Sequence, residues 1–205
     1  MYPSFIKFKN IDIPDVAMTL WEDIFRYQSS PEDPFWVKSK NTFTTDGQSV
    51  KEFPQDLSGS EHMERIYKLL PRTLLKHMFP EVDLSIFQEV MPQAGWMYAG
   101  SSVTEHIDNW MMPKDPVILA FTDMSITVNK KRYEIAKGDI VSIPTNIPHS
   151  MDPAEHDQQW VAVRCGIDVA RCSIEHLSEM FAYEYIDYLD LTQIQGGVSR
   201  RSGLS

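Results

Sequence analysis

The sequence has few cysteines and no long apolar run. Its two cysteines, Cys165 and Cys172, do not form a CxxC pair, so no disulfide framework is expected and a reducing, cytoplasmic location is predicted. No stretch of about 18 consecutive apolar residues occurs, which argues against a membrane-spanning helix. The first residues lack the apolar segment and the small-residue cleavage site of a signal peptide.

Positive charge is also scarce. Lys and Arg together number 19 against 29 Asp and Glu, which gives a formal net charge of −10. Such a surface repels phosphate backbones and disfavours nucleic-acid binding through a broad basic face. The 205 residues are enough for one domain with a substantial core.

The first 80 residues combine helical and loop patterns. Residues 5–8 predict a short strand, and residues 28–60 predict a long loop with short strands such as Asn41–Thr44. Apolar residues at helical spacing predict two helices, Pro14–Tyr27 and Glu61–Met78, the second one interrupted at Pro71.

From residue 84 onward the sequence is rich in short β-type runs separated by turn signals, which is typical of a barrel or a sandwich. The predicted strands are 84–90, 95–99, 117–122, 125–128, 132–135, 140–143 and 160–167. The predicted turns are Pro92–Gly95, Asn129–Lys130, Lys137–Gly138 and Pro144–Asn146.

These patterns predict one mainly β domain over residues 1–195, with flanking helices at both ends. Residues 1–80 form its helical and loop part, residues 84–167 its barrel core and residues 173–190 a C-terminal helix, which begins near Ser173. The polar residues 196–205 are expected to be disordered.

Two short segments carry residues suited to metal chemistry. In the first, His106 and Asp108 stand two positions apart, and such residues share one face of a strand. In the second, Gly138 and Pro144 bound an apolar strand, and His149 follows. About four short strands fit between the two histidines, enough to return the chain to the same place in a barrel.

Two histidines and one carboxylate leave coordination positions open, which is the arrangement that non-haem Fe(II) oxygenases use. The same donor set also suits Mn(II), Co(II), Ni(II) and Zn(II). Taken alone, the His106–Asp108 pair has a plain alternative, a solvated pair on the surface. The two segments together, in the β-rich half, predict a mononuclear metal site at His106, Asp108 and His149.

The two segments resemble the two motifs of the cupin superfamily. Gly100 and His106 match the first motif, but Asp108 replaces its second histidine and the later glutamate is absent. In the second motif Gly138, Pro144 and His149 match, while Asn146 replaces a glycine. The resemblance implies a double-stranded β-helix, the jelly-roll barrel of cupins, and it covers residues 84–167.

An HxD pair with a distal histidine further resembles the 2-oxoglutarate/Fe(II)-dependent oxygenases, including JmjC-like and prolyl-hydroxylase-like members. This resemblance implies Fe(II) as cofactor, 2-oxoglutarate and O₂ as cosubstrates, and a basic residue on a late strand that pairs with 2-oxoglutarate. Arg164 occupies such a strand, although an internal ion pair would also explain a buried arginine. The predicted helpers are Tyr98, Thr122 and Ser142, and the predicted substrate contacts are Asn109, Trp110 and Trp96.

Two alternatives stay open beside a hydroxylase that acts on a small molecule or a peptide. One is a metal-binding cupin that uses no 2-oxoglutarate, such as an isomerase or a simple dioxygenase. The other is a non-catalytic cupin that binds a small ligand or a partner chain. Cupin-like barrels often dimerise, so a homodimer also stays open.

Overall fold

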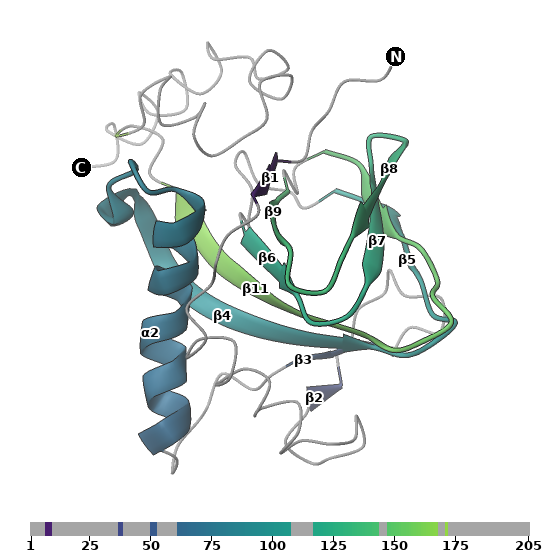
Figure 1. Ribbon diagram of the computed structural model, residues 1–205, viewed down its shortest axis with the longest axis horizontal. Helices are drawn as coiled ribbons and strands as arrows, with labels where there is room; N and C mark the ends of the chain where they lie inside the picture. Colours follow the sequence, from purple (N-terminus) through teal and green to yellow (C-terminus); the bar gives the residue numbers. More distant parts are fainter. Residues whose placement is uncertain are drawn as a thin grey trace, which may run out of the picture.

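Two antiparallel β-sheets face each other, and one helix covers the outer side of the larger sheet (Figure 1). The computed structural model describes residues 7–9, 37–38, 50–52, 61–107, 117–143, 147–167 and 171. Within these ranges the side chains of residues 7–9, 37–38, 50–52, 61–68, 89, 91, 164 and 167 lie outside the description.

Among the described residues, the large sheet contains seven strands. In spatial order they are β1 (Lys7–Lys9), β9 (Ile140–Ser142), β6 (Val117–Ala120), β11 (Gln158–Ile167), β4 (Phe87–Met97), β3 (Val50–Glu52) and β2 (Val37–Lys38). The long strands β4 and β11 pair along almost their whole length and form the centre of the sheet.

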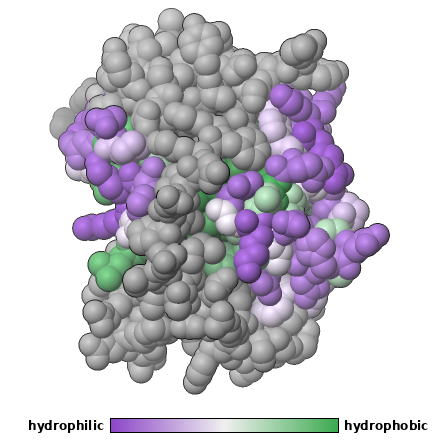
Figure 2. Space-filling view, in the orientation of Figure 1, coloured by the Kyte–Doolittle hydropathy of each residue, from purple (hydrophilic) through white to green (hydrophobic). Residues whose placement is uncertain are grey.

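In the part of the chain that the structure describes, the small sheet contains four strands, in the order β5 (Val103–His106), β10 (His149–Met151), β7 (Met124–Val128) and β8 (Lys131–Ile135). Strands β7 and β8 form a hairpin whose turn residues, Asn129 and Lys130, have φ of 46° and 66°. Positive φ at both turn positions is the geometry that fits the right-handed twist of a two-residue hairpin. Figure 2 shows mainly hydrophilic residues on the surface over these strands.

The strand register identifies the face of the large sheet that looks toward the small sheet. Met97 and Trp160 share one face, because Met97 pairs with Gln158, two residues before Trp160. Both side chains pack with Val103 of β5 and Met151 of β10. The inner face of the barrel therefore carries Met97, Gln158, Trp160 and, by the same alternation, Ala162.

Helix α2 (Glu61–Met78) lies on the opposite side of β4 and β11 from the small sheet (Figure 1). Its residues Leu70, Leu74 and Met78 are buried in the same hydrophobic core as Val161 and Val163 of β11. The predicted interruption at Pro71 was wrong, since the helix continues through this residue. A proline costs a helical hydrogen bond, and we attribute the continuity to the burial of Leu70 and Leu74 on either side of it.

The predicted turn at Pro92–Gly95 was also wrong, and β4 runs through it. Pro92 lies opposite Val163, and β3 begins to pair with β4 only at Gly95. Among the described residues, β4 thus has no second neighbour at Pro92, and a proline without an N–H is tolerated there. The preceding segment is a 3₁₀ turn, Leu84–Ile86, rather than the start of a strand.

Gly95 has a packing role in the middle of the strand. A Cβ atom built there would lie 2.3 Å from Cε2 of Trp160, its cross-strand partner. The indole ring therefore lies over the position that any other side chain would fill. This close approach explains a glycine that turn chemistry does not require.

Most remaining sequence expectations for this region were confirmed. The strands of the barrel core lie within a few residues of their predicted bounds, and turns occur at Asn129–Lys130 and around Gly138. A strand that was not predicted begins at His149. The predictions for Pro14–Tyr27, 41–44, 144–146, 173–190 and 196–205 lie outside the described residues. No helix in the part of the chain that the structure describes is long and apolar enough to span a membrane.

The Gly95→Ala substitution should destabilise the protein by about 1–3 kcal/mol, because the new methyl group overlaps the Trp160 ring and forces the core to shift. Urea unfolding would measure this change. Gly166→Ala is the matched control in the neighbouring strand, where the nearest atom to an added Cβ is 3.8 Å away. Its stability should stay within about 0.5 kcal/mol of wild type. Equal stability of both variants would contradict the packing argument.

Candidate metal centre

His106 and His149 lie side by side on neighbouring strands. Strands β5 and β10 pair in antiparallel fashion, and His149 is the direct partner of His106. The ring centroids are 4.3 Å apart with an interplanar angle of 52°. Residues that are far apart in sequence are therefore brought together by strand pairing, and their imidazoles are close enough to share one metal ion.

Both imidazoles are oriented in the same way by the backbone. Nδ1 of His106 lies 2.8 Å from the carbonyl oxygen of Thr104, and Nδ1 of His149 lies 2.9 Å from that of Ile147. A carbonyl oxygen only accepts, so Nδ1 must donate in each ring. In the neutral imidazole, Nε2 then carries the lone pair, which fixes the tautomer that a metal ligand needs.

The two histidines differ in exposure. His149 is buried, with 8% of its surface exposed, whereas His106 is half-buried. Along β10, His149 stands two residues before Met151, which packs on the inner face of the large sheet. His149 therefore shares the inward face of the small sheet, and the pair lies between the interior of the barrel and the end of β5.

The third predicted ligand, Asp108, lies outside the described residues, just past the end of β5 at His106. Within the described ranges no group of three His, Cys, Asp or Glu residues converges on one point. The structure thus brings two of the three predicted ligands together, and Asp108 stays a prediction.

Arg164 lies on β11, opposite Met91 of β4. Trp160 and Ala162 belong to the inner face, and Arg164 is the next residue of β11 in this alternation. The register with β4 shifts after it, between Arg164 and Gly166. The side chain of Arg164 is outside the description, so its role as an anchor stays a prediction.

The three predicted helper residues occupy different surroundings. Thr122 accepts a hydrogen bond from the backbone N–H of Gln159 through Oγ1, at 3.0 Å. Tyr98 is half-buried, and its carbonyl accepts from the N–H of Ser101. Ser142 is buried and lies two residues after Ile140, so the two side chains share one face of β9. Ile140 pairs with Leu119, and Leu119 pairs with Val161, which places this face on the outer side of the large sheet. The register therefore does not favour Ser142 beside the histidines.

Trp96 belongs to the framework that supports this end of the barrel. It is 5% exposed, and its Nε1 donates to Oδ2 of Asp157 at 2.8 Å. Oδ1 of the same carboxylate accepts from the backbone N–H of Ala99 at 2.8 Å. Asp157 thereby joins the start of β11 to the end of β4. The other predicted substrate contacts, Asn109 and Trp110, lie outside the described residues.

Sequence reasoning missed two contributors to the site, the carbonyl groups of Thr104 and Ile147 that orient the histidines. It also missed the buried carboxamide of Gln158, which faces the barrel interior. Backbone carbonyls leave no signal in a sequence. A glutamine at the start of a strand likewise reads as a solvated residue until the register places it inward.

Comparisons with known proteins find the fold but no sequence family. No family model matches the sequence, and no curated protein matches it. Among solved structures, a prolyl-4-hydroxylase from Pseudomonas putida aligns with a TM-score of 0.52 at 10% identity, covering 78% of this chain and 91% of that one. A prolyl hydroxylase from Trichoplax adhaerens, in complex with a hypoxia inducible factor peptide fragment, aligns with a TM-score of 0.55 at 11% identity. This alignment covers 82% of this chain and 87% of that one.

At such low identity these matches show the fold alone. The chain has a jelly-roll barrel similar in fold to these two prolyl hydroxylases, which confirms the fold class expected from the two motifs. The identity of the metal, the cosubstrate and the substrate all require the arguments that follow.

The His149→Ala and His106→Ala variants should each bind Co(II) at least about 10–100-fold more weakly than wild type, because losing even an indirect support of a metal ligand has a cost of that size. Isothermal titration would measure the affinities. His156→Ala is the control, since His156 is exposed and its Nε2 lies 2.9 Å from the carbonyl oxygen of Asp123. Unchanged affinity in His149→Ala would contradict the assignment of the centre.

Proposed function

We propose that this protein is an Fe(II)- and 2-oxoglutarate-dependent oxygenase that hydroxylates a small molecule or a peptide. The observation that carries the proposal is the cross-strand pair of His106 and His149, with both Nδ1 atoms bonded to backbone carbonyls. This arrangement presents two imidazole nitrogens of matched tautomer at one place in a barrel of the oxygenase kind.

The donor set fits iron. His106 and His149 would supply two nitrogens and Asp108 one carboxylate oxygen, which leaves positions for a cosubstrate and O₂. When bound there, Fe(II) would support the decarboxylation of 2-oxoglutarate to succinate and CO₂, coupled to insertion of one oxygen atom into a C–H bond. The protein's own contribution is to hold the ligands, orient the cosubstrate and exclude water.

Arg164 is the proposed anchor for 2-oxoglutarate. It lies on β11 directly after Val163, the last residue of this strand that pairs with β6, and its sequence neighbours Val163 and Cys165 are buried. A guanidinium group that enters a protein interior needs a partner, and a carboxylate meets it with two parallel hydrogen bonds. Tyr98 and Thr122 stay predicted helpers of this anchor.

The substrate is proposed only by class. A net charge of −10 disfavours nucleic acid, which leaves small molecules and peptides. The Trichoplax adhaerens protein of the same fold holds a peptide fragment, and this supports a peptide as one of the two classes.

Anaerobic addition of Fe(II) and 2-oxoglutarate to the metal-free protein should produce a visible metal-to-ligand charge-transfer band that needs both components. The Asp108→Ala variant should lose the band, because the carboxylate ligand is absent. Arg164→Met should require at least about tenfold more 2-oxoglutarate, since truncating one member of a buried charge pair costs about 2–5 kcal/mol.

Arg72→Met is the control for the arginine variant, because Arg72 is exposed on α2. Its band should appear at the same 2-oxoglutarate concentration as in wild type. Fe(II) binding without any band in the wild-type protein would overturn the 2-oxoglutarate assignment and favour a metal-binding cupin of another activity. Absence of Fe(II) binding would overturn the metal site itself.

A further inference from the structure

Gln158 is a buried polar residue on the inner face of the barrel. It is the first residue of β11, with 1% of its surface exposed. Its cross-strand partner is Met97, and Trp160 stands two residues further on the same face. The register therefore places the carboxamide toward the space between the two sheets.

The nitrogen and the oxygen of this carboxamide differ in their hydrogen bonding. Nε2 donates to the carbonyl oxygen of Asp152 at 3.0 Å, which settles the end of the group that carries nitrogen. Oε1, at the other end, is buried and has no hydrogen-bond partner among the described residues. Burial of an unpaired carbonyl oxygen is costly, and native structures rarely keep one without a use.

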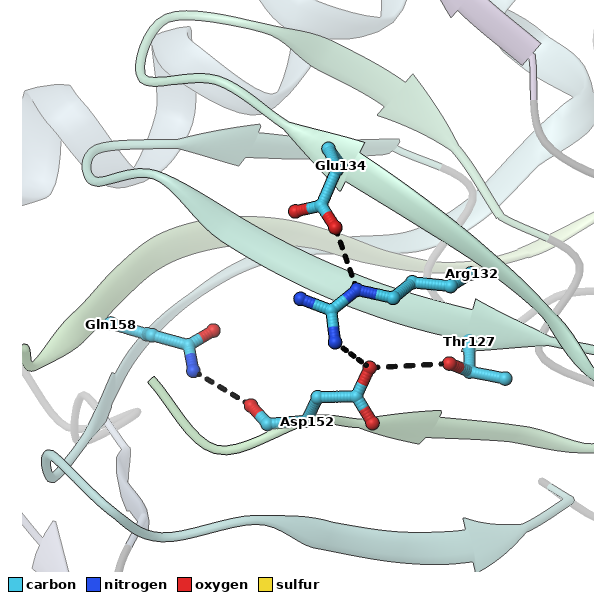
Figure 3. Close-up of polar contacts among 5 residues, drawn as sticks. All are labelled: Thr127, Arg132, Glu134, Asp152 and Gln158. Carbon is cyan, nitrogen blue, oxygen red and sulfur yellow. Dashed lines mark hydrogen bonds and ion pairs between the residues drawn. The ribbon is translucent and has the colours of Figure 1, made fainter. Parts of the chain in front are cut away.

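Oε1 of Gln158 is also held in a fixed position, because Asp152, which accepts from Nε2 of the same carboxamide, is itself held by its neighbours. Asp152 is bound on its side-chain end by Arg132, whose Nη1 lies 3.1 Å from Oδ2, and by Oγ1 of Thr127 at 3.3 Å (Figure 3). Nε of Arg132 in turn lies 2.6 Å from Oε1 of Glu134. The hydrogen bond with Glu134 raises the pKa of Arg132, so the guanidinium stays positively charged beside the carboxylate of Asp152.

The residues that share the inner face with Gln158 are apolar. Met97 and Val103 are buried, and Met151 and Trp160 pack against them half-buried. Asp152, which holds the carboxamide, follows His149 by three residues, or about 10 Å along an extended strand. Met151 is unbranched and flexible, so this side of the lining can move to admit a ligand group.

We propose that Gln158 is a substrate-positioning residue, whose Oε1 accepts a hydrogen bond from an O–H or N–H group carried by an apolar, preferably aromatic, part of the substrate. The proposal rests on the proposed function, because it gives the oxygenase site its substrate class. Trp160 and the two methionines would pack against the ring, and the fixed acceptor would select a ring with a donor over one without.

The test uses phenol and toluene as probes of the full-length, metal-free protein, so that its result does not depend on metal or 2-oxoglutarate binding. The two probes have similar size, but only phenol has a donor. NMR would follow the side-chain amide of Gln158, assigned in the wild-type protein by triple-resonance correlation to its own backbone. Phenol should shift this resonance and bind about fivefold more tightly than toluene, the ratio that one hydrogen bond provides.

The preference for phenol should vanish in Gln158→Met and persist in Gln159→Met, whose side chain lies on the opposite face of β11. The comparison of the two probes on the wild-type protein stands even if the Gln158 variant fails to fold. Equal binding of the two probes would mean an apolar pocket without a positioning role for Gln158. No binding of either probe would overturn the proposal altogether.

Discussion

The pairing of β5 with β10 is the interaction on which the rest of the account depends. It places His149 directly opposite His106, and a shift of one residue would turn one imidazole to the other face of the sheet. The register is held on both sides, because β10 also pairs with β7 through His149, Ser150 and Met151. The two imidazoles of such a centre are held both by the strand register and by the backbone carbonyls that accept from their Nδ1 atoms.

The long path between the two histidines follows from the jelly-roll topology. Four strands separate them, with β6 and β9 in the large sheet and β7 and β8 in the small one. Burial of both sheet faces drives this closure, as Leu119, Val128 and Ile140 have no exposed surface. The inner face then carries apolar residues with a few polar groups, the composition expected of a ligand site.

The sequence predicted most strands of the barrel core, because alternation and turn chemistry are local signals. The expectation that the two histidines come together rested on the two motifs and on the strands between them, and the pairing of β5 with β10 brings them together. It failed at Pro92 and Gly95, where a proline is tolerated on an open stretch of β4 and a glycine receives the ring of Trp160. Both reasons lie in the strand pairing and packing of the folded chain, which no local pattern contains. The inward carboxamide of Gln158 was missed for the same reason, since only the pairing with Met97 reveals its face.

The central claim is that His106, Asp108 and His149 hold one metal ion. Crystals of the protein grown with Mn(II), recorded at a wavelength where manganese scatters anomalously, test it most directly. We predict a single anomalous peak bonded to Nε2 of both histidines and to the carboxylate of Asp108, with both Nδ1 atoms still on their carbonyls. A peak elsewhere, or no peak between the two rings at saturating Mn(II), would contradict the claim.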